Sequence, residues 1–76
     1  MTEILHIDGR REVIDTPMTT QEMRDIVGGE VEVVYLPNDK YLIVNSNRQG
    51  LSRNLTASNI AGRLLVGRAI FTDQLK

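Results

Sequence analysis

Hydrophobic residues recur along the chain in short runs, separated by polar segments that contain glycine, proline or asparagine. The first two runs flank Asp8-Gly9, a dipeptide that favours a two-residue hairpin turn because glycine tolerates a positive φ. This pattern predicts an N-terminal hairpin with strands at about 3–7 and 10–15.

A second pair of runs, 30–36 and 40–45, is rich in β-branched and aromatic residues. The segment between them, Pro37-Asn38-Asp39, is typical of a turn, because proline presets φ and the other two residues tolerate turn geometry. These features predict a central hairpin. A last apolar run predicts a strand over 64–72, in which Gly67 marks a bulge or a close approach.

The first helix has clear signals at both of its ends. Thr19 and Glu22 have the spacing of a capping box, in which each side chain accepts from the backbone amide of the other residue. Apolar residues then recur at helical spacing until Gly28-Gly29, which favours a left-handed helix end. A helix is therefore predicted at about 20–27.

A second short helix is predicted at about 55–61, with Asn54 as its N-cap and Gly62 at its end. The element order is then β-β-α-β-β-α-β. Short connections of this kind favour an α+β domain, with a small antiparallel or mixed five-stranded sheet and both helices on one face. We expect the whole chain, 1–76, to form one such domain.

The length of the chain raises the question of a second subunit. Seventy-six residues lie near the size at which one hydrophobic core is marginal, and the chain has no cysteine for a disulfide. Oligomerisation is the remaining support, so a monomer and a homodimer are both open. With no cysteine and one histidine, we expect no metal site and no cofactor.

Charges are sorted along the sequence. Residues 1–39 contain nine acidic residues and three arginines, whereas residues 40–76 contain six basic residues and one acidic residue. If the two halves fold onto different faces, one face attracts basic partners and the other attracts anions. The sequence pI of about 5.7 argues against charge-driven coating of DNA.

Neither a membrane-spanning apolar run nor a signal peptide is evident in the sequence. We therefore expect a cytoplasmic protein without a membrane partner.

The loop from Asn45 to Asn54 is the first candidate site. It leads into the predicted second helix, whose free amides favour an anion, and it contains two arginines that can grip a phosphate. The candidate ligand-binding residues are Asn47, Arg48, Arg53 and Asn54. The alternative is a solvated connection in which Asn54 serves as a helix cap.

A second candidate site combines acidic and aromatic side chains that a protein partner could contact. It comprises Glu22, Asp25, Glu30, Glu32, Tyr35 and Tyr41. Two of the acids alternate along one strand and so share a face, and the tyrosines flank the central turn. The alternatives are a sheet edge kept soluble by charge and simple cross-strand packing of the two rings.

The stretch from Ile26 to Val34, with its Val-Gly-Gly step, resembles a small family of uncharacterised proteins from bacteriophages, plasmids and mobile elements. The strand Tyr41 to Asn45, the Asn54-Leu55-Thr56-Ala57 helix start and Leu65-Val66-Gly67 fit the same family pattern. The resemblance implies a small accessory protein in a bacterial host cell, one that binds and modulates or inhibits a host protein such as a defence protein.

Two functions remain open on this basis. The first is the accessory protein that binds a host protein. The alternative is a dimeric module that sequesters a nucleotide or another phosphorylated signal in the 45–54 loop. We do not expect an enzyme, because no nucleophile has an activating partner in the sequence and no phosphate-binding glycine loop precedes a helix. Direct nucleic-acid binding ranks below both functions.

Overall fold

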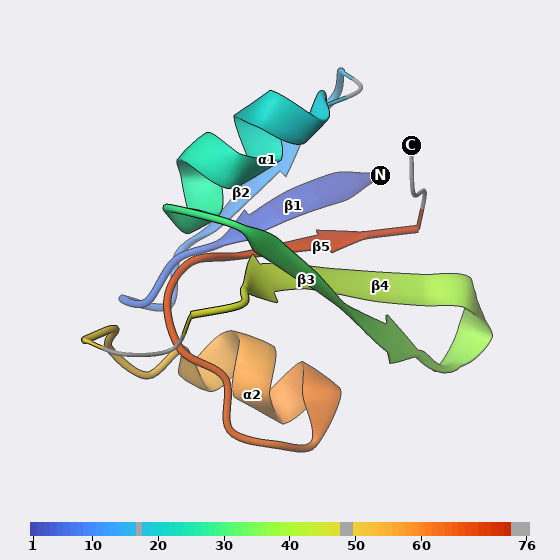
Figure 1. Ribbon diagram of the computed structural model, residues 1–76. Helices are drawn as coiled ribbons and strands as arrows, with labels where there is room; N and C mark the ends of the chain where they lie inside the picture. The colour runs from blue at the N-terminus through green and yellow to red at the C-terminus, as the bar shows by residue number, and fades with distance from the viewer. Residues whose placement is uncertain (17, 48–49, 74–76) are drawn as a thin grey trace.

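The computed structural model describes residues 1–16, 18–47 and 50–73. It confirms the α+β class and the order β-β-α-β-β-α-β (Figure 1). All five strands form one antiparallel sheet in the order β2-β1-β5-β4-β3. The elements are β1 (Thr2–Leu5), β2 (Arg11–Ile14), α1 (Thr20–Val27), β3 (Val31–Leu36), β4 (Lys40–Asn45), α2 (Leu55–Ala61) and β5 (Ala69–Thr72).

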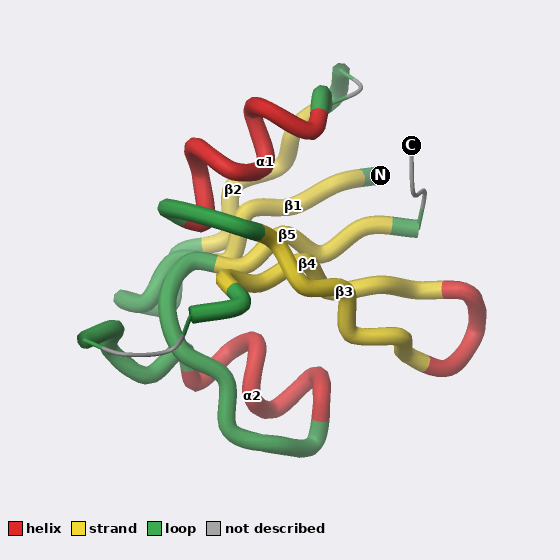
Figure 2. The backbone as a smooth tube through the Cα atoms, in the orientation of Figure 1, coloured by secondary structure: helices red, strands yellow, loops and turns green. Residues whose placement is uncertain are grey.

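The two helices lie on opposite faces of the sheet (Figures 1 and 2), so the expectation of both helices on one face is wrong. Neighbouring residues of a strand point to opposite faces, and both faces of β4 are apolar: Leu42 and Val44 face α2, whereas Ile43 faces α1. A sheet with two apolar faces needs a helix on each.

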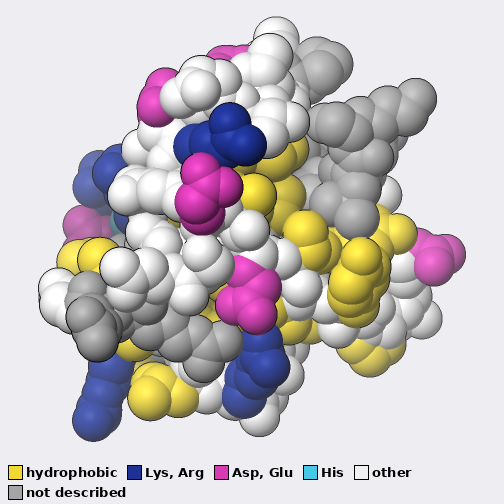
Figure 3. All heavy atoms as spheres, in the orientation of Figure 1, with side chains coloured by type: hydrophobic (Ala, Val, Ile, Leu, Met, Phe, Trp, Pro, Cys, Tyr) yellow, Lys and Arg dark blue, Asp and Glu magenta, His cyan; other side chains and the backbone are white. Residues whose placement is uncertain are grey.

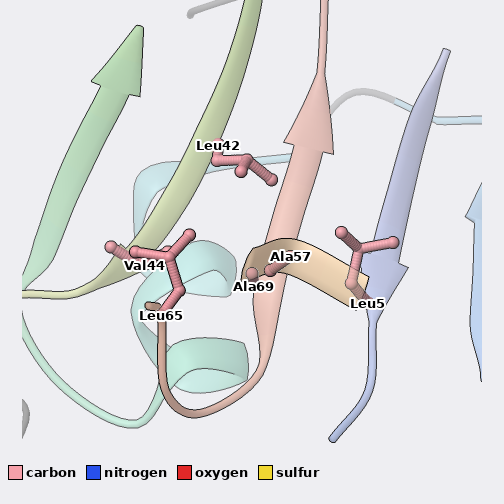
Figure 4. Close-up of a cluster of buried hydrophobic side chains, with 6 residues drawn as sticks. All are labelled: Leu5, Leu42, Val44, Ala57, Leu65 and Ala69. Carbon is pink, nitrogen blue, oxygen red and sulfur yellow. The ribbon is translucent and has the colours of Figure 1, made fainter. Parts of the chain in front are cut away.

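Each helix covers its own hydrophobic cluster. The cluster under α2, drawn in Figure 4, consists of Leu5, Leu42, Val44, Ala57, Leu65 and Ala69. The cluster under α1 consists of Met23, Val27, Ile43 and Ile70. The central strands β4 and β5 contribute to both clusters, so the core is divided by the sheet.

The N-terminal hairpin has a longer turn than predicted. The His6 amide donates to the Arg10 carbonyl at 2.9 Å, and the Gly9 amide donates to the His6 carbonyl at 3.1 Å. Gly9 has a φ of 94°, but Asp8 is not among the residues with positive φ. The connection is therefore a three-residue loop, Ile7 to Gly9, because the two-residue turn would need positive φ at both positions.

The last strand is shorter than predicted, since β5 begins at Ala69. Gly67 has a φ of 77°, which ends the extended run, and its amide donates to the Ser52 carbonyl at 2.7 Å. A bridge between Arg53 and Val66 continues this pairing. The residues before β5 therefore pair with the segment that precedes α2, outside the main sheet.

The helix ends follow their sequence signals. Thr19 and Glu22 form the predicted capping box, with backbone-to-side-chain bonds of 2.9 and 3.1 Å. Gly28 ends α1 at a φ of 87°, and Gly62 ends α2 at a φ of 72°. The Ala57 amide donates to Asn54 Oδ1 at 3.0 Å, which confirms Asn54 as the N-cap of α2.

Asn54 also holds two other segments of the chain. Its Nδ2 donates to the Leu5 carbonyl at 2.8 Å and to the Gly67 carbonyl at 2.9 Å, and its side chain is fully buried. One amide group thus joins α2, the end of β1 and the turn before β5. Removing the donor would leave two buried carbonyls without a partner. An unpaired buried carbonyl lowers the stability by more than the net contribution of one hydrogen bond.

We expect Asn54→Asp to lower the free energy of unfolding by about 3 kcal/mol, because the carboxylate keeps the helix cap but cannot donate to the two carbonyls. Urea denaturation followed by circular dichroism measures the change. Asn59→Asp, at an exposed position of α2, is the matched control and should cost less than about 0.5 kcal/mol. Equal losses in the two variants would contradict the structural role of Asn54.

Candidate functional site

A cleft of about 560 Å³ opens beside the turn of the N-terminal hairpin. Four segments that are distant in the sequence form its walls: the β1–β2 turn, the end of α1, part of the 45–54 loop and the turn before β5. We call it the hairpin cleft. Its lining residues are His6, Ile7, Asp8, Arg10, Val27, Gly28, Gly50, Leu51, Ser52, Gly67 and Arg68.

The described contacts explain why three of these segments meet: the end of β1, the loop after β4 and the turn before β5. The Asn54 amide ties the end of β1 to Gly67, and the Gly67 amide is bonded to Ser52. Gly67 also lies against Leu51, since a Cβ at this glycine would be 3.1 Å from Leu51 Cδ1. The turn before β5 and the loop after β4 are therefore in close contact along one wall of the cleft.

Asp8 and Arg10 form an ion pair at the hairpin turn. Arg10 Nε donates to Asp8 Oδ2 at 2.7 Å, and the Arg10 backbone amide donates to Asp8 Oδ1 at 3.0 Å. Two hydrogen bonds from Arg10 hold the pKa of Asp8 below its ordinary value. The bond from the backbone amide has the larger effect, and the bond from the guanidinium has the smaller one. Asp8 is therefore ionised at neutral pH and balances the charge of Arg10.

His6 lies in the same wall. Its Nε2 is 3.1 Å from Glu12 Oε1, and its side chain is 15% exposed. The carboxylate fixes the orientation of the imidazole and occupies one of its two nitrogens. Ser52 also lines the cleft, but among the described residues no hydrogen bond joins its hydroxyl to His6.

Arg68 differs from the arginines of the first half of the chain. Those three all have carboxylate partners: Arg10 with Asp8 at 2.7 Å, Arg11 with Glu3 at 2.7 Å and Arg24 with Glu30 at 3.8 Å. Within the part of the chain that the structure describes, Arg53, Arg63 and Arg68 form no ion pair. Of these three, Arg68 alone lines the cleft, and it gives the cleft a positive charge without a counterion.

The predicted loop site is not assembled as expected. The Asn54 side chain is buried and all of its hydrogen bonds are made within the protein, so it presents no surface to a ligand. Arg53 and Asn47 are exposed but do not line the cleft. Arg48 lies outside the described residues. Residues 50–52 of the same loop do line the cleft.

Four charged or titratable residues of the cleft were not predicted as site residues from the sequence: His6, Asp8, Arg10 and Arg68. Each lies next to a turn glycine or at the end of a strand. The sequence of these segments indicated turns and strands but did not indicate a binding site. The pairing of residues 52–54 with residues 65–67 brings Arg68 to the loop, and this pairing has no local signature.

The predicted protein-interaction residues divide between the β3–β4 hairpin and α1. Glu30, Glu32 and Tyr35 lie on or just before β3, and Tyr41 follows on β4. The two rings meet edge to face, with centroids 5.7 Å apart. On α1, by contrast, Glu22 belongs to the capping box, and Asp25 accepts a hydrogen bond from Gln21 at 2.9 Å.

The acidic and basic halves of the chain are interleaved in space. Strands β5 and β4, from the second half, lie between β1 and β3, from the first half. Figure 3 shows side chains of both signs on the same face. The charge sorting of the sequence therefore does not give this face a single sign.

Among the residues described, no group of three or more histidine or acidic side chains is placed to hold a metal ion. Neither helix is long and apolar enough to cross a membrane. Comparisons of the chain with family models, curated proteins and solved structures find no match.

Gly67→Ala should destabilise the protein more than Gly50→Ala. Both glycines have a positive φ, 77° and 75°, so alanine strains the backbone at both positions by about 1 kcal/mol. A Cβ at Gly50 meets nothing within 4 Å, whereas one at Gly67 is forced against Leu51. Urea denaturation of the pair measures the difference, and equal losses would show that Leu51 does not pack tightly on Gly67.

Proposed function

We propose that the protein is a non-enzymatic binding protein that holds a small phosphorylated ligand, such as a nucleotide, in the hairpin cleft. The observation that supports this most directly is Arg68, an exposed guanidinium in the wall of the cleft that has no ion-pair partner among the described residues. A guanidinium can bind a phosphate through two parallel hydrogen bonds, with geometry that a lysine does not offer.

The size and lining of the cleft fit such a ligand. Small-molecule sites usually measure about 300–1,000 Å³ and combine apolar walls with a few polar groups. Here Ile7 and Leu51 offer apolar surface, and Arg68 offers a positive charge. The phosphate would lie at the Arg68 side of the cleft, because at the hairpin turn Asp8 neutralises Arg10.

Binding is favoured over catalysis by the state of the titratable side chains. The imidazole of His6 is engaged by Glu12, and the carboxylate of Asp8 is engaged by Arg10. Neither group has a described hydrogen bond to a hydroxyl that it could activate. The 45–54 loop contributes to this proposal through residues 50–52, rather than through the asparagines and arginines first considered.

The accessory protein that binds a host protein stays a second hypothesis. In support of it, Glu32 and Tyr35 lie on the edge strand β3, Glu30 directly precedes this strand, and Tyr41 lies on the adjacent strand β4. A sheet end of this kind can accept a strand from a partner. The phage or mobile-element setting that motivates this hypothesis rests on the sequence resemblance.

Isothermal titration with pyrophosphate and with a panel of nucleoside phosphates tests the cleft. Arg68→Gln should weaken binding by roughly 10- to 150-fold, which corresponds to about 1.5–3 kcal/mol for a lost charged hydrogen bond. Asp8→Asn should have the opposite effect, because it removes a negative charge from the cleft and frees Arg10 for the anion.

Arg63→Gln is the matched control, since Arg63 is exposed and unpaired among the described residues but lies outside the cleft lining. It should leave the affinity within about twofold, as expected of a charge that does not touch the ligand. If Arg63→Gln weakens binding as much as Arg68→Gln, the anion is attracted by general charge, and the cleft is not a site. The absence of binding by every member of the panel would contradict the proposal.

A further inference from the structure

The two edges of the sheet differ in their protection against strand pairing. The β2 edge has four residues, and the charged side chains of Arg11 and Glu12 lie on it. The β3 edge has six residues, of which Glu32 alone is charged and the other five are apolar. Natural sheets usually guard an open edge with charge, proline or short length, and β3 has one charged residue as its only protection of this kind.

The hydrogen bonds of the β3–β4 pair show which backbone groups remain open. The Ser46 amide donates to the Glu30 carbonyl at 2.9 Å, so residue 30 faces β4. Because this direction alternates along a strand, Glu32, Val34 and Leu36 also face β4. The amides and carbonyls of Val31, Val33 and Tyr35 point to the open side, beyond which the described chain places no other strand (Figure 1).

We propose that a second copy of this chain pairs with β3, antiparallel and about a two-fold axis at Val33. In this register Val33 lies opposite Val33 of the second copy, and Val31 lies opposite Tyr35. Every outward residue of both strands then belongs to a pair that exchanges two backbone hydrogen bonds. A register centred on Val34 would instead place Val31 opposite Pro37, which has no amide hydrogen to donate.

The side chains fit this register on the α1 face of the sheet. Tyr35 is 74% exposed in the single chain, although it is a large aromatic residue. Opposite Val31 of the second copy it would form a pair of aromatic and β-branched side chains, a combination that stabilises antiparallel strands. Figure 3 shows hydrophobic side chains exposed beside the β3–β4 hairpin.

The acidic side chains of the edge do not oppose one another in this register. Glu32 would lie opposite Val34 of the second copy, so the two glutamates do not oppose each other directly. Glu30 would lie opposite Leu36, whose neighbour on β4 of the second copy is Lys40. Within its own chain Glu30 is paired with Arg24 and Lys40 is paired with Asp73, both at 3.8 Å, so this register sets no unpaired like charges against each other.

The size of the described domain gives an independent reason for the dimer, because a hydrophobic core of this size is near the limit of what is stable alone. Pairing would produce one continuous ten-stranded sheet. No residue of β3 lines the hairpin cleft, so this proposal stands or falls separately from ligand binding.

Sedimentation equilibrium over a range of concentrations tests the interface. The wild-type protein should have twice the 8.6 kDa mass of one chain. Val33→Pro removes an outward amide and should weaken the dimer by about 30-fold or more, because two interface hydrogen bonds are lost. Val13→Pro is the matched control on β2: the His6–Arg10 bond and the strand register place its amide outward as well, and the dimer should persist.

Val33 also packs against the cluster under α1, so circular dichroism must show that Val33→Pro is folded. If Val33→Pro does not fold, Tyr35→Lys tests the interface in its place, because the Tyr35 side chain is exposed and the change puts a charge at the interface. Amide exchange adds a residue-level signature: Val31, Val33 and Tyr35 should become protected as the concentration rises, while Glu32 and Val34 are protected throughout.

A wild-type mass of 8.6 kDa at every concentration would overturn the proposal, and the edge would then be open to a strand of another protein. A dimer that survives both Val33→Pro and Tyr35→Lys, or that Val13→Pro abolishes, would overturn it as well. Loss of the dimer in the folded β3 variants alone would establish the interface.

Discussion

The arrangement of the chain around α2 depends on one buried amide, the side chain of Asn54. Its donor hydrogens bind the carbonyls of Leu5 and Gly67, and its oxygen caps α2. A buried amide is costly unless all of its bonds are made, so the end of β1, the turn before β5 and the start of α2 are fixed together. The hairpin cleft lies next to this junction, and Asn54 joins two of the segments that form it, the end of β1 and the turn before β5.

Features with a local cause could be predicted from the sequence. The capping box of Thr19 and Glu22, the glycine ends of both helices and the central hairpin each depend on residues within a few positions of one another. The arrangement of the helices and the length of β5 could not be predicted in this way. The first depends on both faces of β4 being apolar, and the second depends on residues 65–67 pairing with 52–54.

The candidate site also depends on contacts between residues that are distant in the sequence, so it could not be predicted from local patterns. Asn54 was a reasonable ligand residue in a polar loop, because a sequence does not distinguish an amide that faces a ligand from one that faces a buried carbonyl. Arg68 had no neighbour in the sequence that suggested a site. It reaches the cleft because Gly67 ends the pairing with residues 52–54 and turns the chain into β5.

The charge sorting of the chain has a structural outcome different from a molecular dipole. The arginines of the first half are each paired with an acid of the same half, over distances of 2.7–3.8 Å. The described arginines of the second half, Arg53, Arg63 and Arg68, have no such partners among the residues described, because few acids lie near them in the sequence and the sheet brings none close. Sorting the charges thus leaves a few guanidinium groups uncompensated around α2 and the turn before β5. Arg68 is the one of these three that lines the hairpin cleft, where it lies among both apolar and polar side chains.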